Sequence, residues 1–573
     1  MKRLFGIFLA AVLCASAIDT TAQAANTKSP KMTTIDTDIT YQTIDGFGAS
    51  YTWYSDWMTN IDDKETGYDW IFNDAEFNIL RFRDQHGLKG DEKNVPIDGY
   101  KPYKAYYEAA VARGIDPIVL VTSWGQYDRS LPFVAFNELS EKGYSYYTLA
   151  KDENGEYMYD ELAEFCVQSI QYFFDAGIPV HYFSISNEIE LQELHKDETG
   201  KAREEAGFFF GAEETDDYCA YWKTHLAVYD AFQKAFGDKA PSIVGAETMA
   251  GTPSLMNSYL QPLLTDHPEK LDMIAHHLYG TALTAANFQE LQQNFSDYRL
   301  WQTEWYSNQY YNLGEVILNE LINENLTAFL YWNGVWIEDD GNCLIEINTW
   351  EHDAEIKRMP GHYIMMHFSK FIKNGYKRVD VAEDLNSKIG AFISPDNSKL
   401  VVVAANSHIK AEELHLDIDR EILNSEVYRS TAHQDKYMEA MGAYEAGMAM
   451  PAKTLTTIVL ELGDEIVKET EVSEGMEPGD MEAEDAESED VEEPESVGSA
   501  DTEEPGATKN TESEVTATTD SEGNETETDK SLETPILVEN NLGTYLAIAG
   551  VVLAVVIAVT VAIVIVKRKN REP

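Results

Sequence analysis

Cysteine is scarce in this sequence of 573 residues, which contains four. Cys14 lies in an N-terminal apolar stretch, and Cys166, Cys219 and Cys343 are scattered, with neither a zinc-ligand spacing nor a disulfide framework. One pair could form a disulfide, but buried free thiols suit the scattered spacing better. A Gly-rich phosphate loop is also absent after every predicted strand, and no cofactor or metal is predicted.

Positive charge is scarce as well, since 43 Lys and Arg face 100 Asp and Glu for a net charge of −57. The stretch from Asp464 to Glu539 has 28 acidic residues, three lysines and no aromatic residue. Such a segment cannot bury enough apolar surface to offset its ordering entropy, so residues 464–544 are predicted to be a disordered linker or stalk. The remaining chain is still acidic, which argues against nucleic acid as a partner.

Long apolar runs are confined to the two ends of the sequence. Residues 1–24 combine a basic start, an apolar stretch and Ala-Gln-Ala, the pattern of a signal peptide. Residues 545–566 are long enough for one transmembrane helix, and the basic tail 567–573 follows. No sortase-type LPxTG motif precedes the run, so the helix itself is predicted to be the anchor. We therefore expect an exported, cell-surface, single-pass protein with its folded part outside.

Between residues 43 and 370, short apolar strands alternate with longer helical patterns, and both Glu161 to Ala176 and Asp217 to Phe236 end at a glycine. Eight strands separated by helices predict a (β/α)8 barrel, with a doubly wound sheet as the alternative. The predicted strands are Thr43 to Phe47, Asn78 to Phe82, Asp116 to Thr122, Val180 to Ser186, Ser242 to Gly245, Met273 to His277, Arg299 to Thr303 and Ala328 to Trp332.

The pattern changes after residue 370, where short strands are split by turns. Residues 371–463 are therefore predicted to form a β-sandwich domain. The segment 25–42 contains a strand-like stretch and is expected to join this domain.

Carboxylates stand where two of the barrel strands end. The stretch HYFSISNEIELQELH begins as a buried strand and then breaks into Asn187-Glu188, and strand seven ends on Glu304. Functional side chains of barrel enzymes gather at these strand ends, and glycoside hydrolysis needs two carboxyl groups. Glu188 and Glu304 are therefore the candidate catalytic pair, whereas Glu190 is expected to be a substrate contact or a solvated charge.

Other residues near the strand ends suit the same chemistry. Arg81 could keep the nucleophile ionised by lowering its pKa, or could form a purely structural ion pair. His277 and Tyr279 end strand six, where Tyr279 could hydrogen-bond the nucleophile, while His276 fits a core histidine equally well. Aromatic residues could stack on sugar rings, although each alone is more often core; they are Trp53, Trp124, Trp305, Trp332 and Trp336. The run Phe208 to Phe210 could extend the cleft or equally cap the barrel.

At this point four motifs resemble glycoside hydrolase family 30 of clan A, the glucosylceramidase- and xylanase-like enzymes. They are IDGFG at residue 44, Asn187-Glu188, Thr-Glu-Trp around Glu304, and HFSKFI at residue 367. The resemblance covers about residues 33 to 462 and implies a barrel with a side β-domain that cleaves β-glycosides with retention of configuration. It implies that Glu188 is the acid/base, Glu304 the nucleophile, and Asn187 the amide that binds the sugar 2-hydroxyl.

The sequence departs from the family pattern at three places. Ile189 follows Asn187-Glu188 in place of the usual proline, and strand three ends in Thr-Ser-Trp-Gly. After strand eight, Glu338, Asp339 and Asp340 stand where glucuronoxylanases of the family carry an arginine, so they would repel a glucuronate branch. We expect a neutral β-linked polysaccharide, xylan first, with β-1,6-glucan, a glucosylceramide-like β-glucoside or non-catalytic carbohydrate binding as alternatives.

Overall fold

The computed structural model describes residues 30–84, 101–124, 131–137, 146–190, 208–307, 310–337, 342–383 and 385–466. The predicted signal peptide, most of the acidic linker, the apolar run at 545–566 and the basic tail lie outside these ranges. Within them, no helix combines the length and the apolar character that a membrane crossing requires.

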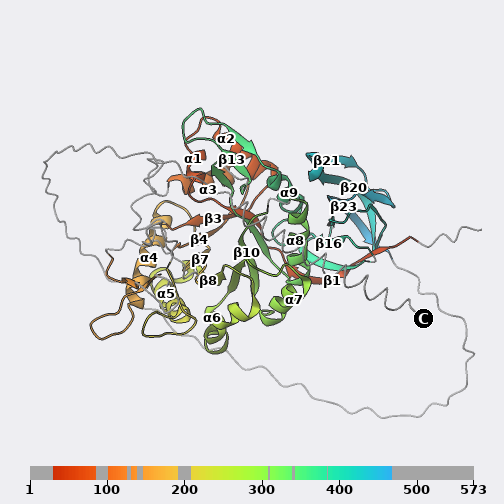
Figure 1. The fold of residues 1–573 in the computed structure, drawn as a ribbon. Helices are drawn as coiled ribbons and strands as arrows, with labels where there is room; N and C mark the ends of the chain where they lie inside the picture. The colour runs from red at the N-terminus through yellow and green to blue at the C-terminus, as the bar shows by residue number, and fades with distance from the viewer. Residues whose placement is uncertain are drawn as a thin grey trace, which may run out of the picture. The chain divides into compact units, whose positions relative to one another are not determined.

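Eight parallel strands close into a barrel, as the sequence predicted (Figure 1). The first barrel strand begins at Gly46, three residues later than expected, because Thr43 still belongs to the preceding strand. Gly48 is required in this strand, since a Cβ there would lie 1.9 Å from the carbonyl oxygen of Ile79. In chain order the barrel strands are β2 (Gly46–Ser50), β3 (Ile79–Arg83), β4 (Ile118–Thr122), β7 (Tyr182–Ser184), β8 (Ser242–Thr248), β9 (Met273–His277), β10 (Arg299–Trp305) and β11 (Ala328–Tyr331).

Helices surround the barrel in Figure 1, and their apolar faces pack on the outward-facing residues of the strands. A smaller cluster that includes Val244, Trp301 and Leu330 fills the barrel interior. The predicted helices at 161–176 and 217–236 correspond to α4 and α5, and α5 begins four residues later than predicted. The helices are α1 (Ser55–Met58), α2 (Lys64–Asp69), α3 (Lys101–Ala112), α4 (Tyr159–Asp175), α5 (Tyr221–Phe236), α6 (Pro253–Asp266), α7 (Ala285–Asn294), α8 (Tyr310–Asn323) and α9 (Pro360–Ser369).

The region after the barrel forms a β-domain with two unequal layers. An eight-stranded sheet in the order β19-β1-β15-β16-β17-β23-β20-β21 packs its apolar side chains with Leu414 and Met450 of the two-stranded sheet β18-β22. These strands are β1 (Thr33–Thr43), β15 (Lys377–Glu383), β16 (Lys388–Ile393), β17 (Lys399–Asn406), β18 (Glu412–Leu414), β19 (Leu416–Ile418), β20 (Arg420–Thr431), β21 (Lys436–Gly442), β22 (Met448–Met450) and β23 (Thr454–Glu465).

The β-domain is joined to the barrel by a buried histidine. His367 of α9 lies 2.8 Å from Oγ1 of Thr457 in β23 and 2.7 Å from Oγ of Ser430 in β20. The motif HFSKFI therefore carries a contact between the barrel and the β-domain.

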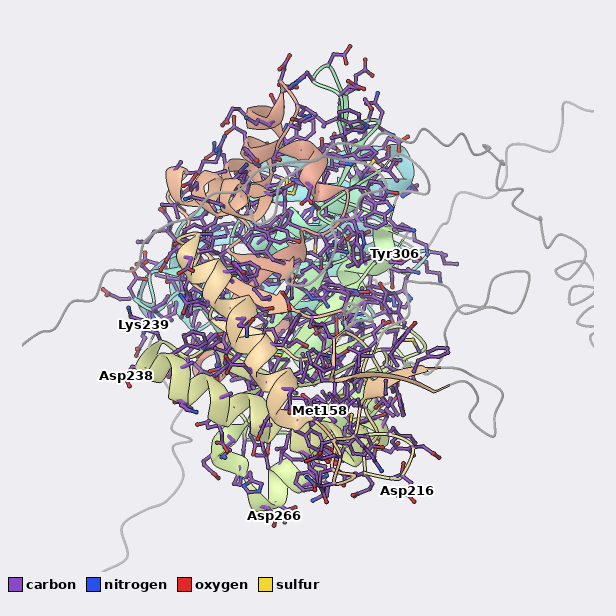
Figure 2. All side chains as sticks on the ribbon, turned by 90° about the vertical axis from the view of Figure 1, so that its left-hand side faces the viewer. Met158, Asp216, Asp238, Lys239, Asp266 and Tyr306 are labelled. Carbon is purple, nitrogen blue, oxygen red and sulfur yellow. The ribbon has the colours of Figure 1, made fainter. Side chains whose placement is uncertain are left out.

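Two small sheets lie in the loops of the barrel. They are formed by β5 (Val134–Asn137) with β6 (Tyr146–Leu149), and by β12 (Val335–Ile337), β13 (Ile345–Ile347) and β14 (Ile356–Arg358). Figure 2 labels Tyr306, which follows β10, on one side and Asp238 and Lys239, which precede β8, on the other. Tyr306 thus lies towards the carboxyl ends of the strands.

Candidate active site

Arg81 is the centre of a buried polar network at the carboxyl ends of the barrel strands. Its side chain has no exposed surface. Nη1 donates to Glu304 Oε2 at 2.8 Å, and Nη2 donates to Asn187 Oδ1 at 2.6 Å. Nη2 also lies 3.0 Å from Glu247 Oε1. One guanidinium therefore ties together side chains from strands two, four, five and seven of the barrel.

The two predicted catalytic carboxylates lie close to each other. One oxygen of Glu188, one oxygen of Glu304 and one ring nitrogen of His277 all lie within 4.8 Å of one another. Glu188 follows β7 with a positive φ of 51°, and its backbone N–H donates to the carbonyl of Glu247 at 3.0 Å. The turn after the strand thus holds Glu188 so that its side chain faces Glu304.

His277 stands between the carboxylates. Its Nδ1 lies 3.0 Å from Glu188 Oε1 and 3.9 Å from Glu304 Oε1, and its Nε2 lies 3.8 Å from Glu247 Oε1. Burial alone would lower the pKa of His277, but these three carboxylates raise the pKa to about 10. The ring is therefore an imidazolium at neutral pH.

The pKa of Glu304 is raised, whereas the sequence analysis expected Arg81 to lower it. The contact with Arg81 is present, but burial raises the pKa of Glu304, and the charges of His277 and Arg81 only oppose this rise. Tyr279 interacts with the same carboxylate through its hydroxyl, and burial raises the pKa of Tyr279 above its ordinary value. Full desolvation of the carboxylate is the effect that the sequence could not reveal.

Glu247 was missed by the sequence analysis. It is fully buried, and although burial favours protonation, Arg81 and His277 lower the pKa of Glu247 to about 2. It is therefore a fixed negative charge behind the catalytic pair. The available signal was an apolar strand with a carboxylate near its end, SIVGAET, but the predicted strand stopped at Gly245, three residues too early.

Four of the five predicted tryptophans form one aromatic cluster. Trp53 lies at ring-centroid distances of 5.2 Å from Trp124, 5.7 Å from Trp332 and 6.2 Å from Trp336. The guanidinium of Arg81 lies over Trp124 at 4.5 Å, which joins the cluster to the carboxylates. All four rings are partly exposed. They form a partly exposed aromatic surface beside the carboxylate pair.

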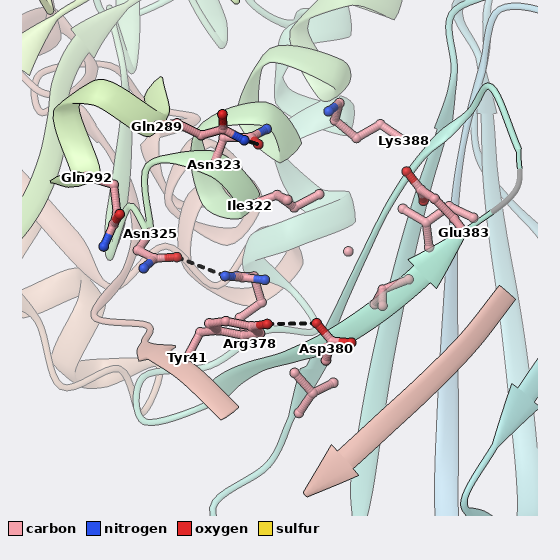
Figure 3. Close-up of a pocket in the computed structure, with 14 residues that line it drawn as sticks. Tyr41, Gln289, Gln292, Ile322, Asn323, Asn325, Arg378, Asp380, Glu383 and Lys388 are labelled. Carbon is pink, nitrogen blue, oxygen red and sulfur yellow. Dashed lines mark hydrogen bonds between the residues drawn. The ribbon is translucent and has the colours of Figure 1, made fainter. Parts of the chain in front are cut away.

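Trp305 lies outside this cluster, since among the described residues it makes no ring contact with the other four. It lines a separate cavity of about 370 Å³ with Leu283, Asn312 and Glu315. A larger cavity of about 470 Å³ lies near α7, α8, β15 and β16 (Figure 3), where Arg378 donates to Asn325 at 2.8 Å. Neither cavity is lined by Glu188 or Glu304, so neither includes the catalytic pair.

The structure narrows the alternatives for two loop features. Phe208 to Phe210 are buried, which favours the cap on the barrel over an extension of the cleft. Glu190 is neither solvated nor free, because its Oε1 accepts from the backbone N–H of Met249 at 2.6 Å and burial raises its pKa to about 7. Cys166, Cys219 and Cys343 are buried free thiols, as expected. Glu338, Asp339 and Asp340 lie outside the described residues.

The fold and the site together define a (β/α)8 barrel with a carboxylate pair at the carboxyl ends of its strands, the arrangement that glycoside hydrolysis uses. No family model matches the chain. The glucuronoxylanase XynC of Bacillus subtilis is 28% identical over 159 residues, which are 25% of this chain and 35% of that protein. The match thus spans about a third of the length of this relative.

Solved structures resemble the chain over a longer range. A family 30 endoxylanase of Clostridium papyrosolvens has a TM-score of 0.56 at 21% identity, over 75% of this chain and 100% of that chain. Xylanase C of Talaromyces cellulolyticus has a TM-score of 0.58 at 18% identity, over 75% and 99%. An endo-β-1,6-glucanase has a TM-score of 0.56 at 17% identity, over 75% and 94%. The fold is that of glycoside hydrolase family 30, and the resemblance that the motifs indicated is confirmed.

Proposed function

We propose that this protein is a retaining β-glycoside hydrolase that acts on a β-linked polysaccharide, with xylan as the first substrate to test. The proximity of Glu188 and Glu304 supports the proposal most directly. Retaining glycosidases need their carboxyl groups about 5–5.5 Å apart, whereas inverting enzymes need roughly 6.5–9.5 Å. The nearest oxygens of the two carboxylates lie within 4.8 Å of each other, which supports the shorter spacing of the retaining class.

The proposed reaction has two steps. In the first, protonated Glu188 gives its proton to the leaving glycosidic oxygen while Glu304 attacks the anomeric carbon, so an ester bond to Glu304 forms as the glycosidic bond breaks. In the second, Glu188 takes a proton from water, the water oxygen attacks the anomeric carbon, and the ester bond to Glu304 breaks. The positive charges of Arg81 and His277 favour the ionised state that Glu304 needs for attack.

Asn187 and the tryptophan cluster would bind the sugar. The amide oxygen of Asn187 is occupied by Arg81, so its NH₂ group is free to donate to a sugar hydroxyl. The cluster around Trp53 offers aromatic faces to the apolar faces of sugar rings. Glu338, Asp339 and Asp340 would repel a glucuronate branch, which favours a neutral chain over a glucuronate-substituted one.

A panel of polysaccharides tests this function. Wild type and Glu304→Gln are incubated with linear xylan, glucuronoxylan, β-1,6-glucan and β-1,4-glucan, and reducing ends are measured. We expect wild type to release sugar from a neutral glycan and Glu304→Gln to release none. Equal background release by both proteins from every glycan would favour a non-catalytic binder. An inverted initial anomer in proton NMR would contradict the roles assigned to the two glutamates.

We also propose that the protein is exported and anchored at the cell surface by residues 545–566. The motivating features are the signal-like residues 1–24 and the basic residues that follow the apolar run. Expression of the full chain beside a variant that ends at residue 544 tests the anchor. The full chain should fractionate with membranes and the shortened chain with the medium, whereas equal fractionation would rule out this anchor.

A further inference from the structure

A second buried polar cluster lies on the outer side of the barrel wall, away from the tryptophans. His276 belongs to β9, Glu320 to α8, and Glu324 directly follows α8. The three side chains have no exposed surface. One ring nitrogen of His276 and one oxygen of each carboxylate lie within 4.8 Å of one another. Glu320 and Glu324 are four residues apart, which places both on one face of the helix end.

The tautomer of His276 is fixed by the backbone. Nδ1 lies 3.0 Å from the carbonyl oxygen of His277, and a carbonyl only accepts, so Nδ1 carries the proton and donates it. In the neutral ring, Nε2 then has a lone pair, and it lies 2.7 Å from Glu324 Oε1. Two acceptors at this distance repel each other unless a proton or a metal ion lies between them. Histidines that bind metals are oriented by this same N–H to carbonyl bond.

Several polar atoms around His276 lack a partner among the described residues. They include both side-chain oxygens of Glu320 and Oε2 of Glu324. Gln302 of β10, the register neighbour of His276, has an unpartnered amide oxygen and nitrogen as well. A buried carboxylate without a counter-charge is unfavourable, and within the described part of the chain the one ion pair of these two carboxylates is with His276. The cluster is therefore short of positive charge.

We propose that His276, Glu320 and Glu324 bind a divalent transition-metal cation, with Zn²⁺ as the best match. One imidazole nitrogen with carboxylate oxygens is a donor set that zinc accepts, whereas Ca²⁺ and Mg²⁺ prefer oxygen alone. Gln302, the register neighbour of His276 with an unpartnered amide, is a further candidate ligand. The site would be structural, because it ties α8 to β9 directly behind His277. It does not depend on the proposed glycosidase activity.

A proton is the competing occupant. Burial and the neighbouring Glu324 raise the pKa of Glu320 well above its ordinary value, which favours the protonated acid in a metal-free cluster. The two occupants make opposite predictions for Glu320→Gln, which has the shape of the protonated acid. If the cluster binds a metal, this substitution would abolish the binding. If the cluster holds a proton instead, the substitution would leave the stability of the protein unchanged.

The test uses the full chain, stripped with EDTA, dialysed and titrated with Zn²⁺ by calorimetry. Co²⁺ serves as a second probe, because its visible absorption reports ligand geometry. We expect one tightly bound Zn²⁺ per chain and a higher Tm with the metal. Glu320→Gln and Glu324→Gln should each weaken binding by about 100-fold or more, a loss at or above the upper end of that seen for mutations of the supporting residues around a metal.

Glu188→Gln is the matched control, because Glu188, His277 and Glu304 form another group whose atoms could hold an ion. It should bind Zn²⁺ as wild type does, and far-UV circular dichroism checks that each variant folds. The proposal is overturned if wild type binds neither metal below about 1 mM. It is also overturned if Glu320→Gln binds Zn²⁺ like wild type, or if Glu188→Gln removes the binding.

Discussion

His277 Nδ1 lies 3.0 Å from Glu188 Oε1, so the candidate acid/base is hydrogen-bonded to an imidazolium. The same nitrogen lies 3.9 Å from Glu304 Oε1. A single positive charge therefore faces both carboxylates of the pair. The other ring nitrogen of His277, Nε2, lies 3.8 Å from Glu247, whose negative charge balances the imidazolium. Charged residues at the ends of several strands are therefore in electrostatic contact.

Glu188→Gln should lower kcat on a polysaccharide by about 10²–10⁴-fold, the usual contribution of a general acid. The loss in kcat/KM should be much smaller on an aryl glycoside whose phenol leaves without protonation, because kcat/KM reports the first step, and that step then bypasses Glu188. Glu304→Gln should be inactive on both substrates. Steady-state kinetics on the two substrates provide the measurement, and an equal loss on both for Glu188→Gln would contradict its role as the acid.

Glu247→Gln should destabilise the protein by about 3–5 kcal/mol, because it leaves the buried charge of Arg81 with one partner fewer. It should also lower the pKa of His277, so that activity declines at a lower pH on the alkaline side than in wild type. Denaturant unfolding and a pH profile of kcat/KM measure the two effects. Glu346→Gln is the control, since Glu346 is buried but pairs with exposed Lys357, and it should leave the pH profile unchanged.

The pKa of His277 also links stability to pH. It is about 10 in the folded state and about 6.5 in an unfolded chain, so the folded state binds the proton more tightly. Its stabilising effect is complete below pH 6.5 and is lost as the pH rises from about 6.5 to 10, by at most about 1.4 kcal/mol per pH unit. Denaturant unfolding at several pH values should show a shallower decline for His277→Gln, and parallel curves would be inconsistent with this assignment.

The barrel was predictable because its strands are buried on both faces and therefore read as short apolar runs. The strand Met273–His277 has the predicted bounds, whereas the first strand begins three residues late. The end of β1, TYQT at residues 40–43, runs directly into IDGFG at residues 44–48. The apolar content of this stretch therefore does not show where β1 ends and β2 begins. Strand pairing decides the boundary, since Thr43 pairs with Lys377 of β15 and Gly46 with Ala328 of β11.

The sequence shows which carboxylates stand at the ends of apolar strands, and Glu188, Glu304 and Glu247 all do. Arg81 stands out as well, because charge is rare inside a strand. Glu247 escaped because the sequence shows neither its full burial nor its contact with Arg81. Trp305 was grouped with the other tryptophans because it also stands at a strand end. The strand has an irregularity between Gln302 and Trp305, and the sequence does not show how this irregularity directs the ring.

Trp53→Ala should raise KM for a polysaccharide, because a stacking ring contributes about 0.5–1.5 kcal/mol, equivalent to a change of up to roughly tenfold. Trp305→Ala is the natural comparison, since Trp305 lies outside the cluster and should change KM less. Kinetics on xylo-oligosaccharides of increasing length provide the readout, or on oligosaccharides of whichever glycan proves to be cleaved. A larger effect of Trp305→Ala would place the sugar-binding surface at Trp305 instead of at the cluster around Trp53.

His367 should make the contact between α9 and the β-domain sensitive to acid. Burial lowers the pKa of His367 to about 3, while in an unfolded chain it is about 6.5. The unfolded chain therefore binds more protons between these values, and stability falls as the pH drops from about 6.5 towards 3.

His367→Phe removes this titration but leaves the hydroxyls of Thr457 and Ser430 without their shared partner. We expect the variant to be about 1–3 kcal/mol less stable at pH 7 and to lose less stability on acidification. Denaturant unfolding at pH 7, 5.5 and 4.5 measures both effects, and an equally steep acid decline in the variant would show that other buried histidines, such as His225 and His362, dominate it.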